Sequence, residues 1–261
     1  MTHVPMETLL TGGNVNQVVK VGDTVRRLTG PHSRTVHEFL RHLEATCVPI
    51  PKLLGIDDEG REILSYMEGE TTFSQGLWKT DTALVASVEL LRRFHDASLS
   101  FVPTKPVVWG FEYPNITQHE VICHNDFAPY NMVFWHGSPI GILDFDLCGP
   151  GPRIRDVAYL AYWMVPMSFG LGDLQNLSLQ DVGLRCRRFR LICETYGIDD
   201  PVSLLRMISE VLHYMASPEA VQKIVGAAAA ERLRSGGHFD HWARQAAAFD
   251  DTLHDLIAIV T

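Results

Sequence analysis

The 261-residue sequence contains few cysteines, and none of them forms a CxxC pair. Zinc ribbons and redox motifs use closely spaced pairs, and the disulfide frameworks of small secreted domains use a dense, even set. The sequence therefore predicts neither a zinc ribbon, nor a thiol-redox motif, nor a disulfide scaffold. The five scattered cysteines are Cys47, Cys123, Cys148, Cys186 and Cys193.

Positive charge is also scarce. Lys and Arg number 22 against 31 Asp and Glu, which gives a formal net charge of −9. General binding to nucleic acid or to an anionic membrane surface relies on a basic protein surface. We therefore expect neither a nucleic acid nor a membrane as partner.

The sequence has no long hydrophobic run. The longest, Val157 to Met167, is far shorter than the roughly 20 residues with which a helix crosses a bilayer. Residues 1–10 lack a basic segment followed by an apolar one, so no signal peptide is expected. These absences predict a soluble, cytoplasmic protein. A hydrophobic content of 46% is sufficient for a large buried core.

Strand and turn patterns dominate the first third of the chain. Gly22 and Asp23 separate two β-rich runs, and a two-residue connection of this type predicts a hairpin. A helix is expected where apolar residues recur at helical spacing, from Val36 to Leu43. The expected elements are strands at 17–21, 24–28, 53–56 and 62–66 and a helix at 35–45.

The rest of the chain is predicted to be largely helical, apart from an apolar, β-branched segment at 121–146. The expected helices cover 82–97, 157–163, 181–196, 201–215, 218–234 and 241–259. The whole pattern predicts an α+β fold with a small β-rich lobe at 1–64, a hinge at 65–69 and a larger helical lobe at 70–261.

One segment carries most of the chemical information. It reads His124-Asn125-Asp126-Phe127-Ala128-Pro129-Tyr130-Asn131, and an apolar strand and Asp144-Phe145-Asp146 follow it. Phosphoryl transfer needs a positioned hydroxyl group and neutralised phosphates. Asp126 is a candidate acceptor for the hydroxyl's proton, and Asn131 and Asp144 offer oxygen ligands to magnesium. His124 is expected to pack beneath the loop and to form hydrogen bonds there.

These two motifs, in this order and spacing, resemble those of the aminoglycoside phosphotransferase family, which shares the protein-kinase-like fold with choline kinase. The resemblance covers about residues 10–165 and is sharpest between Cys123 and Ala161. It implies that ATP or GTP binds between the lobes, that Asp126 is the catalytic base, and that Asn131 and Asp144 hold magnesium. It also implies that Asp156, in Arg155-Asp156-Val157-Ala158, ties the first helix of this region to the catalytic loop.

The nucleotide-binding lobe matches that family less closely. Arg27 stands where kinases carry a strand lysine, and strand alternation places it on the same face as Val25, which would line the adenine pocket. Arginine can bind phosphate bidentately, so the change is chemically tolerable. The alternative is that Arg26 and Arg27 are both solvated strand residues. The simplest alignment places Val36 at the family's helical glutamate, with Glu38 two residues away, so the usual ion pair is not predicted.

Two further parts of the nucleotide site are implied by the resemblance. The segment 11–16, which includes Asn14, occupies the position of the loop that covers the phosphates, although it lacks a G-x-G-x-x-G pattern. The segment 63–69 resembles the stretch that joins the lobes, where backbone groups of Ser65 and Met67 would pair with the adenine edge. An ordinary strand end explains that segment equally well.

The substrate is expected to be a small hydroxylated molecule. Only twelve positions separate Asp144 from Asp156, which leaves no room for the longer loop that supports a peptide in protein kinases. The family's members include antibiotic-inactivating enzymes, so an aminoglycoside or another cationic acceptor fits the acidic chain. The alternative is a kinase-like protein that binds a ligand or confers immunity without turnover, which the altered strand lysine favours. The sequence predicts no oligomeric state.

Several other features are expected to be structural. Residues 238–241 read as a surface turn and not as a metal site, and residues 135–138 read as a hairpin turn. The aromatic cluster of the helix at 157–163 is expected to lie in the core.

Overall fold

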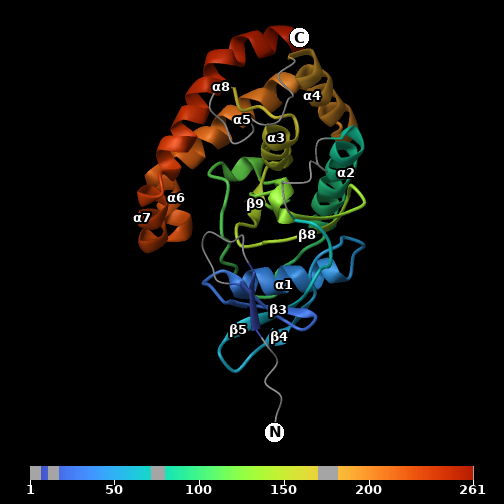
Figure 1. Cartoon of the computed structure of the whole chain (residues 1–261), viewed down its shortest axis with the longest axis vertical. Helices are drawn as coiled ribbons and strands as arrows, with labels where there is room; N and C mark the ends of the chain where they lie inside the picture. The colour runs from blue at the N-terminus through green and yellow to red at the C-terminus, as the bar shows by residue number, and fades with distance from the viewer. Residues whose placement is uncertain (1–6, 11–17, 72–79, 170–181, 261) are drawn as a thin grey trace.

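The computed structural model describes residues 7–10, 18–71, 80–169 and 182–260. The chain forms two lobes, a sheet with one helix toward the N-terminus and a larger, mainly helical lobe toward the C-terminus (Figure 1). This arrangement confirms the predicted α+β, two-lobed fold. No helix of the described residues is long and apolar enough to cross a membrane.

The N-terminal lobe is built on a five-stranded antiparallel sheet in the order β1-β2-β3-β5-β4. Its strands are β1 Glu7–Leu10, β2 Val18–Val21, β3 Thr24–Leu28, β4 Leu53–Ile56 and β5 Arg61–Ser65. The predicted hairpin is confirmed, because Val21 pairs with Thr24 and only Gly22 and Asp23 lie between them. Gly22 has a φ of +59°, which this tight turn requires and glycine adopts at little cost.

Helix α1, Ser33–Glu44, packs its apolar face into the core of the molecule. The predicted stripe is buried, and Phe39 lies at the centre of an aromatic cluster with Phe94, Phe101 and Trp109. Because those partners come from beyond the first lobe, α1 joins the two parts of the chain through one continuous core.

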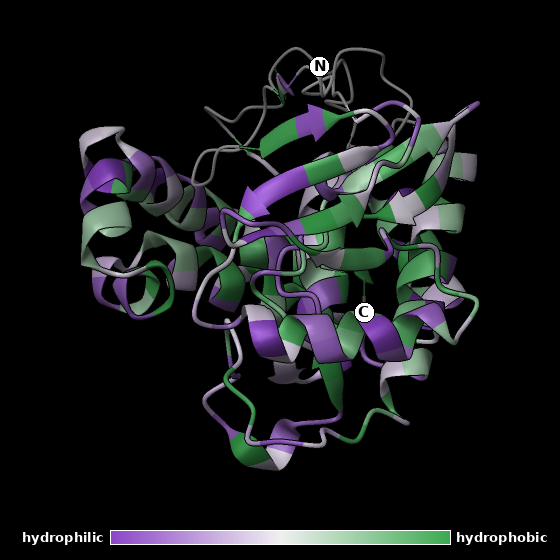
Figure 2. Cartoon of the chain, turned by 90° about the horizontal axis from the view of Figure 1, so that it is seen from below, coloured by the Kyte–Doolittle hydropathy of each residue, from purple (hydrophilic) through white to green (hydrophobic). Residues whose placement is uncertain are grey.

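The C-terminal lobe contains helices of mixed hydropathy (Figure 2). They are α2 Asp81–Ser98, α3 Arg153–Met164, α4 Val182–Tyr196, α5 Pro201–Ala216, α6 Pro218–Val225, α7 Ala227–Ser235 and α8 His238–Val260. Two predictions were wrong. The helix expected at 218–234 is divided at Gly226, whose φ of +79° an α-helix does not allow. Residues 238–241 are the first turn of α8 and not a surface turn.

Two short ladders carry the candidate catalytic motifs. Strand β7, Met132–Trp135, pairs with β8, Ser138–Ile142, so the hairpin turn expected at 135–138 is confirmed. Strand β6, Val121–Cys123, pairs with β9, Gly149–Gly151, which was not predicted because Gly-Pro-Gly carries no strand pattern. Close packing explains the glycine, since a Cβ atom at Gly149 would lie 1.7 Å from the carbonyl oxygen of Phe111.

The chain leaves the sheet at the end of β5 and joins the second lobe through a backbone bridge. Glu70 and Phe134 exchange hydrogen bonds of 2.9 and 2.8 Å, which attaches the connecting segment to β7. Gly69 permits this approach, because a Cβ atom there would lie 2.7 Å from the Phe134 carbonyl oxygen. The segment from Ser65 to Gly69 thus runs from the sheet to the catalytic hairpin.

Candidate active site

Asp126 lies in the loop between β6 and the short 3-10 helix η4, Pro129–Asn131. Its carboxylate accepts hydrogen bonds from the Tyr130 hydroxyl at 2.5 Å and from the Asn131 side-chain amide at 2.8 Å. The Tyr130 hydroxyl also contacts the Tyr159 hydroxyl, 2.8 Å away on α3. Both oxygens of Asp126 are therefore oriented by neighbours close to it in sequence or on α3.

The environment of Asp126 favours its protonated form. Removal of the carboxylate from water raises its pKa to about 7, although the hydrogen bond from Tyr130 stabilises the ion. The negative charge of Asp144 adds to the rise. A carboxylate whose pKa lies near neutral pH is a stronger base than an ordinary aspartate, as proton abstraction from a hydroxyl group requires.

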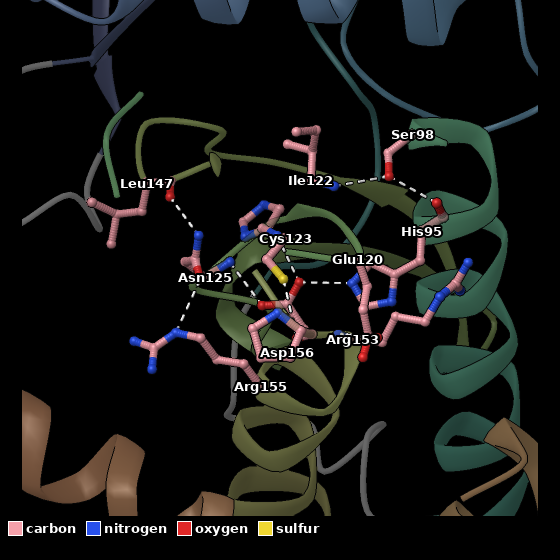
Figure 3. A network of polar contacts seen from close by, with 12 residues as sticks. His95, Ser98, Glu120, Ile122, Cys123, Asn125, Leu147, Arg153, Arg155 and Asp156 are labelled. Carbon is pink, nitrogen blue, oxygen red and sulfur yellow. Dashed lines mark hydrogen bonds and ion pairs between the residues drawn. The ribbon is translucent and has the colours of Figure 1, made fainter. Parts of the chain in front are cut away.

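Asp156, on α3, fixes the backbone of the same loop (Figure 3). Its fully buried carboxylate accepts hydrogen bonds from the backbone amides of His124 and Asn125 at 2.6 and 2.8 Å. His95 of α2 approaches the same carboxylate, with its Nε2 3.0 Å away. Burial alone would raise the pKa of Asp156, but the hydrogen bond and charge of His95 hold it below the ordinary value.

His124 lies under the loop, as the sequence suggested. Its ring is completely buried, and its Nε2 is 2.9 Å from the carbonyl oxygen of Leu143, at the end of the second catalytic strand. The Leu143 amide in turn donates to the Asn131 carbonyl oxygen at 2.8 Å. These contacts hold the two catalytic segments side by side.

Asn131 and Asp144 present oxygen atoms that suit magnesium. The Asn131 amide nitrogen donates to Asp126, which leaves its side-chain oxygen as an acceptor. The Asp144 side chain is 47% exposed, and its backbone φ of +60° is unusual for a residue other than glycine. Carboxylate and amide oxygens are the donors that Mg²⁺ prefers, so the residues present fit this ion.

Arg27 reaches across from β3 to the second catalytic segment. Its guanidinium group lies 3.1 Å from an oxygen of Asp144 and 2.7 Å from an oxygen of Asp146. Its Nε bonds to Glu62, the residue directly opposite on β5. Arg26 points to the other face of the sheet, where it pairs with Asp57. The cation that the sequence assigned to the phosphate site therefore lies beside the proposed metal ligand.

Glu62 was not singled out from the sequence. It is 1% exposed and contacts both Arg27 and the ring of His37, whose Nε2 is 2.5 Å away on α1. Burial alone would raise the pKa of Glu62, but the His37 hydrogen bond and the charge of Arg27 lower it. Glu38 is half-buried and accepts from the Thr104 amide rather than from Arg27, so it does not replace the helical glutamate. The buried acidic partner of Arg27 is instead a strand glutamate, Glu62.

The residues predicted to bind adenine lie in or beside the segment that connects the two lobes, apart from Val25 on β3. The Ser65 amide donates to the carbonyl oxygen of Lys52 at 2.9 Å, which ties this residue into the sheet. Among the described residues, the Met67 backbone has no hydrogen-bond partner, and its pairing with the adenine edge stays a prediction. Val25 pairs with Leu64 in the sheet, and Asn14 lies outside the described residues.

Comparison with known proteins agrees with this geometry. A model of the phosphotransferase enzyme family matches residues 108–188, which include both catalytic segments. The trifolitoxin immunity protein of Rhizobium leguminosarum bv. trifolii is 34% identical over 197 residues, which cover 74% of each chain. The chain belongs to the aminoglycoside phosphotransferase family.

Two solved structures share the fold at low sequence identity. Ethanolamine kinase of Plasmodium vivax superposes with a TM-score of 0.63 at 14% identity, covering 96% of this chain and 83% of that one. The aminoglycoside phosphotransferase APH(2″)-IIa, in a complex with gentamicin, gives 0.58 at 17% identity, with coverage of 94% and 93%. Both likenesses show a shared fold over almost the whole chain.

Proposed function

We propose that the protein transfers the terminal phosphoryl group of ATP or GTP to a hydroxyl group of a small molecule. The observation that carries this proposal is the convergence of Asp126, Asn131 and Asp144 with a cation, Arg27, that comes from the other lobe. Phosphoryl transfer depends on positioning and on charge neutralisation, and these four side chains supply both.

Each residue has a defined role in the proposed reaction. The acceptor oxygen forms a bond to the γ-phosphorus while the bond from that phosphorus to the β,γ-bridging oxygen breaks, and the nucleoside diphosphate leaves. Asp126 orients the hydroxyl group and takes its proton. Arg27 stabilises the phosphate charge, and backbone groups near Met67 bind the base. Asn131 and Asp144 would hold Mg²⁺, which neutralises phosphate charge when bound.

The acceptor is proposed to be a small molecule because the second catalytic segment is short. Strand β9 begins five residues after Asp144 and pairs with β6, and α3 follows at Arg153. An aminoglycoside or a related antibiotic is one candidate, since APH(2″)-IIa, which shares this fold, has been solved in complexes with gentamicin and with streptomycin. The five free thiols and the nucleotide donor suit the reducing, nucleotide-rich cytoplasm.

A second candidate function is immunity through ligand binding alone. The curated relative is an immunity protein, and the chain carries Arg27 in place of the strand lysine. Such a protein would need no base at Asp126. Resistance by phosphorylation would combine both functions, so the two proposals differ only in whether the bound molecule is chemically changed.

A nucleotide-consumption screen tests the proposal. The full chain is incubated with Mg²⁺ and ATP or GTP against hydroxylated amines, aminoglycosides, nucleoside and peptide antibiotics, and sugars. We expect stoichiometric release of the diphosphate with one acceptor and a new phosphomonoester in its ³¹P NMR spectrum. Saturable binding of an acceptor without any phosphomonoester would favour immunity by binding.

The metal site has a test that needs no acceptor. A ligand of the folded state raises the thermal midpoint by mass action, so Mg²⁺ with ADP should stabilise the wild-type protein. Asp144→Ala should abolish the part of the shift that depends on Mg²⁺ and keep the part due to nucleotide alone. An unchanged Mg²⁺ effect in this variant would remove Asp144 from the metal site.

A further inference from the structure

Arg155 is a buried cation that the proposed reaction does not use. It lies on α3 directly before Asp156, and its side chain turns away from Asp156 and past Asn125 (Figure 3). Only 5% of the residue is exposed. Its Nε donates to the Asn125 side-chain oxygen at 3.0 Å, and the guanidinium carbon lies 4.3 Å from the ring centre of Phe111 and 5.2 Å from that of Tyr214.

The two terminal nitrogens of Arg155 have no hydrogen-bond partner among the described residues. Neither is completely enclosed, because no nitrogen of Arg155 is among the fully buried, unpaired polar atoms. No carboxylate of the described chain lies within ion-pair distance, and the nearby Glu210 accepts from the Tyr113 hydroxyl at 2.8 Å instead. Burial lowers the pKa of the guanidinium group, yet arginine stays charged. An unpaired, buried ion is costly, so a ligand anion would relieve the cost.

The position of Arg155 connects it to the acceptor side of the site. Asn125, which accepts its hydrogen bond, immediately precedes Asp126. The Asn125 amide nitrogen also donates to the carbonyl oxygen of Leu147 at 2.9 Å, so both catalytic segments meet above Arg155. Tyr214 comes from α5, and its ring packs against that of Phe111 beside the guanidinium group. An anion at Arg155 would therefore lie next to the loop that presents Asp126.

We propose that the terminal nitrogens of Arg155 bind a carboxylate group of the acceptor, which is then a hydroxy acid. This inference rests on the proposed function, because the acceptor's hydroxyl group is the one that Asp126 orients. Since Nε is already engaged, the two remaining nitrogens form an end-on pair that matches the two oxygens of a carboxylate. The charges of Asp156 and Glu210 make the surroundings of Arg155 acidic, which favours a monoanion over a dianionic phosphate.

The first experiment requires no turnover. The probe is trifluoroacetate, whose ¹⁹F NMR line broadening reports binding of a carboxylate to the full chain. Arg155→Met, which keeps the length of the side chain, should weaken binding about 10- to 100-fold, the range for hydrogen bonds to a charged group. The matched control is Arg153→Met, two residues earlier on the same helix, where the side chain pairs with Asp96. This control should bind as the wild type does.

Other outcomes of this titration overturn the proposal. Equal binding by the wild type and Arg155→Met would place the carboxylate elsewhere, and tighter binding of methylphosphonate than of trifluoroacetate would assign the site to phosphate. If Arg155→Met does not fold, as judged by circular dichroism, Arg155→Lys replaces it. Lysine keeps the charge and loses the paired donors, so we expect intermediate binding, and full affinity would contradict bidentate recognition.

The second experiment uses matched acceptors. Each hydroxy acid is paired with its methyl ester, and the ratio of kcat/KM for acid over ester is measured for the wild type, Arg155→Met and Arg153→Met. We expect a ratio above about 10 that falls toward one only in Arg155→Met. A ratio near one in the wild type overturns the carboxylate assignment. Trifluoroacetate binding that depends on Arg155, without turnover of any acceptor, would support the anion site and contradict the proposed transfer reaction.

Discussion

The catalytic loop and the cluster around Arg27 both hold a charged side chain in place, but they do so with different partners. Asp156 binds two backbone amides of the loop and a buried histidine, all within the C-terminal lobe. Within the described part of the chain, the ion-pair partners of Arg27 are three carboxylates, of which Glu62 is buried and Asp144 and Asp146 are 40–47% exposed. The loop is thus fixed within one lobe, whereas Arg27 bridges two.

This difference indicates which part can change during a reaction cycle. Buried hydrogen bonds to backbone amides cannot be exchanged for water without a large loss of free energy. The Arg27 side chain is only 11% exposed, but Asp144 and Asp146 face solvent, so a phosphate group can replace either carboxylate while Glu62 stays bound. We expect a catalytic loop that is formed before ligands bind and an Arg27 cluster that rearranges when they do.

The largest expected loss in the free energy of unfolding comes from removing the carboxylate that holds the loop of Asp126. Asp156→Ala removes the acceptor of two backbone amides and of His95, and breaking a buried ionic network of this kind costs about 3–5 kcal/mol. Urea denaturation monitored by circular dichroism measures the loss. Asp250→Ala is the control, because that carboxylate pairs with the exposed His213 on the surface and should cost about 1 kcal/mol or less. Equal losses would contradict a special role for Asp156.

A smaller effect is expected at Glu62. Glu62→Gln keeps the size of the side chain but removes the buried negative charge beside Arg27, for which we expect a loss of about 1–3 kcal/mol in the free energy of unfolding. Glu38→Gln, at a half-buried position on α1, should change the same quantity by at most about 0.5 kcal/mol. If the two variants unfold at the same urea concentration, Glu62 is not the partner that fixes Arg27.

Because Arg27 can exchange its carboxylate partners for phosphate, we expect its loss to weaken the binding of ATP in particular, and by a smaller free energy than the losses above. Arg27→Ala should weaken ATP binding about 10-fold, the lower end for a hydrogen bond to a charged group, and change adenosine binding little. Arg26→Ala should affect neither, because Arg26 pairs with Asp57 on the other face of the sheet. Isothermal titration with both ligands measures this. Equal losses for ATP and adenosine would mean that Arg27 acts only on the fold.

Local patterns predicted the elements of the fold well. The Gly22-Asp23 hairpin and the strand at 53–56 lie where the sequence placed them, because turn chemistry and apolar spacing are local signals. The break at Gly226 was missed, since the helix-forming residues before it and the alanine-rich segment after it gave a continuous helical pattern. A glycine within such a pattern is a weak signal, because helices tolerate it at about 1 kcal/mol.

The partners of the candidate site residues were much harder to predict. Glu62 lies on a predicted strand, but only the register of β3 against β5 places it opposite Arg27. The contact of Tyr159 with Tyr130 requires α3 to cross beneath the catalytic loop, and the sequence assigned Tyr159 only to the core. These contacts join residues that are far apart in the chain, so the periodicity of the local sequence does not predict them.

The most direct test of the central claim is the change of a single charge at Asp126. Asp126→Asn keeps the size of the side chain and removes its basicity, and a positioned base typically contributes about 10²- to 10⁴-fold to the rate. Single-turnover phosphorylation of an acceptor from the screen should slow by that factor, while nucleotide affinity stays within about threefold, since Asp126 holds neither phosphate nor metal. Transfer at the wild-type rate in this variant would contradict the account.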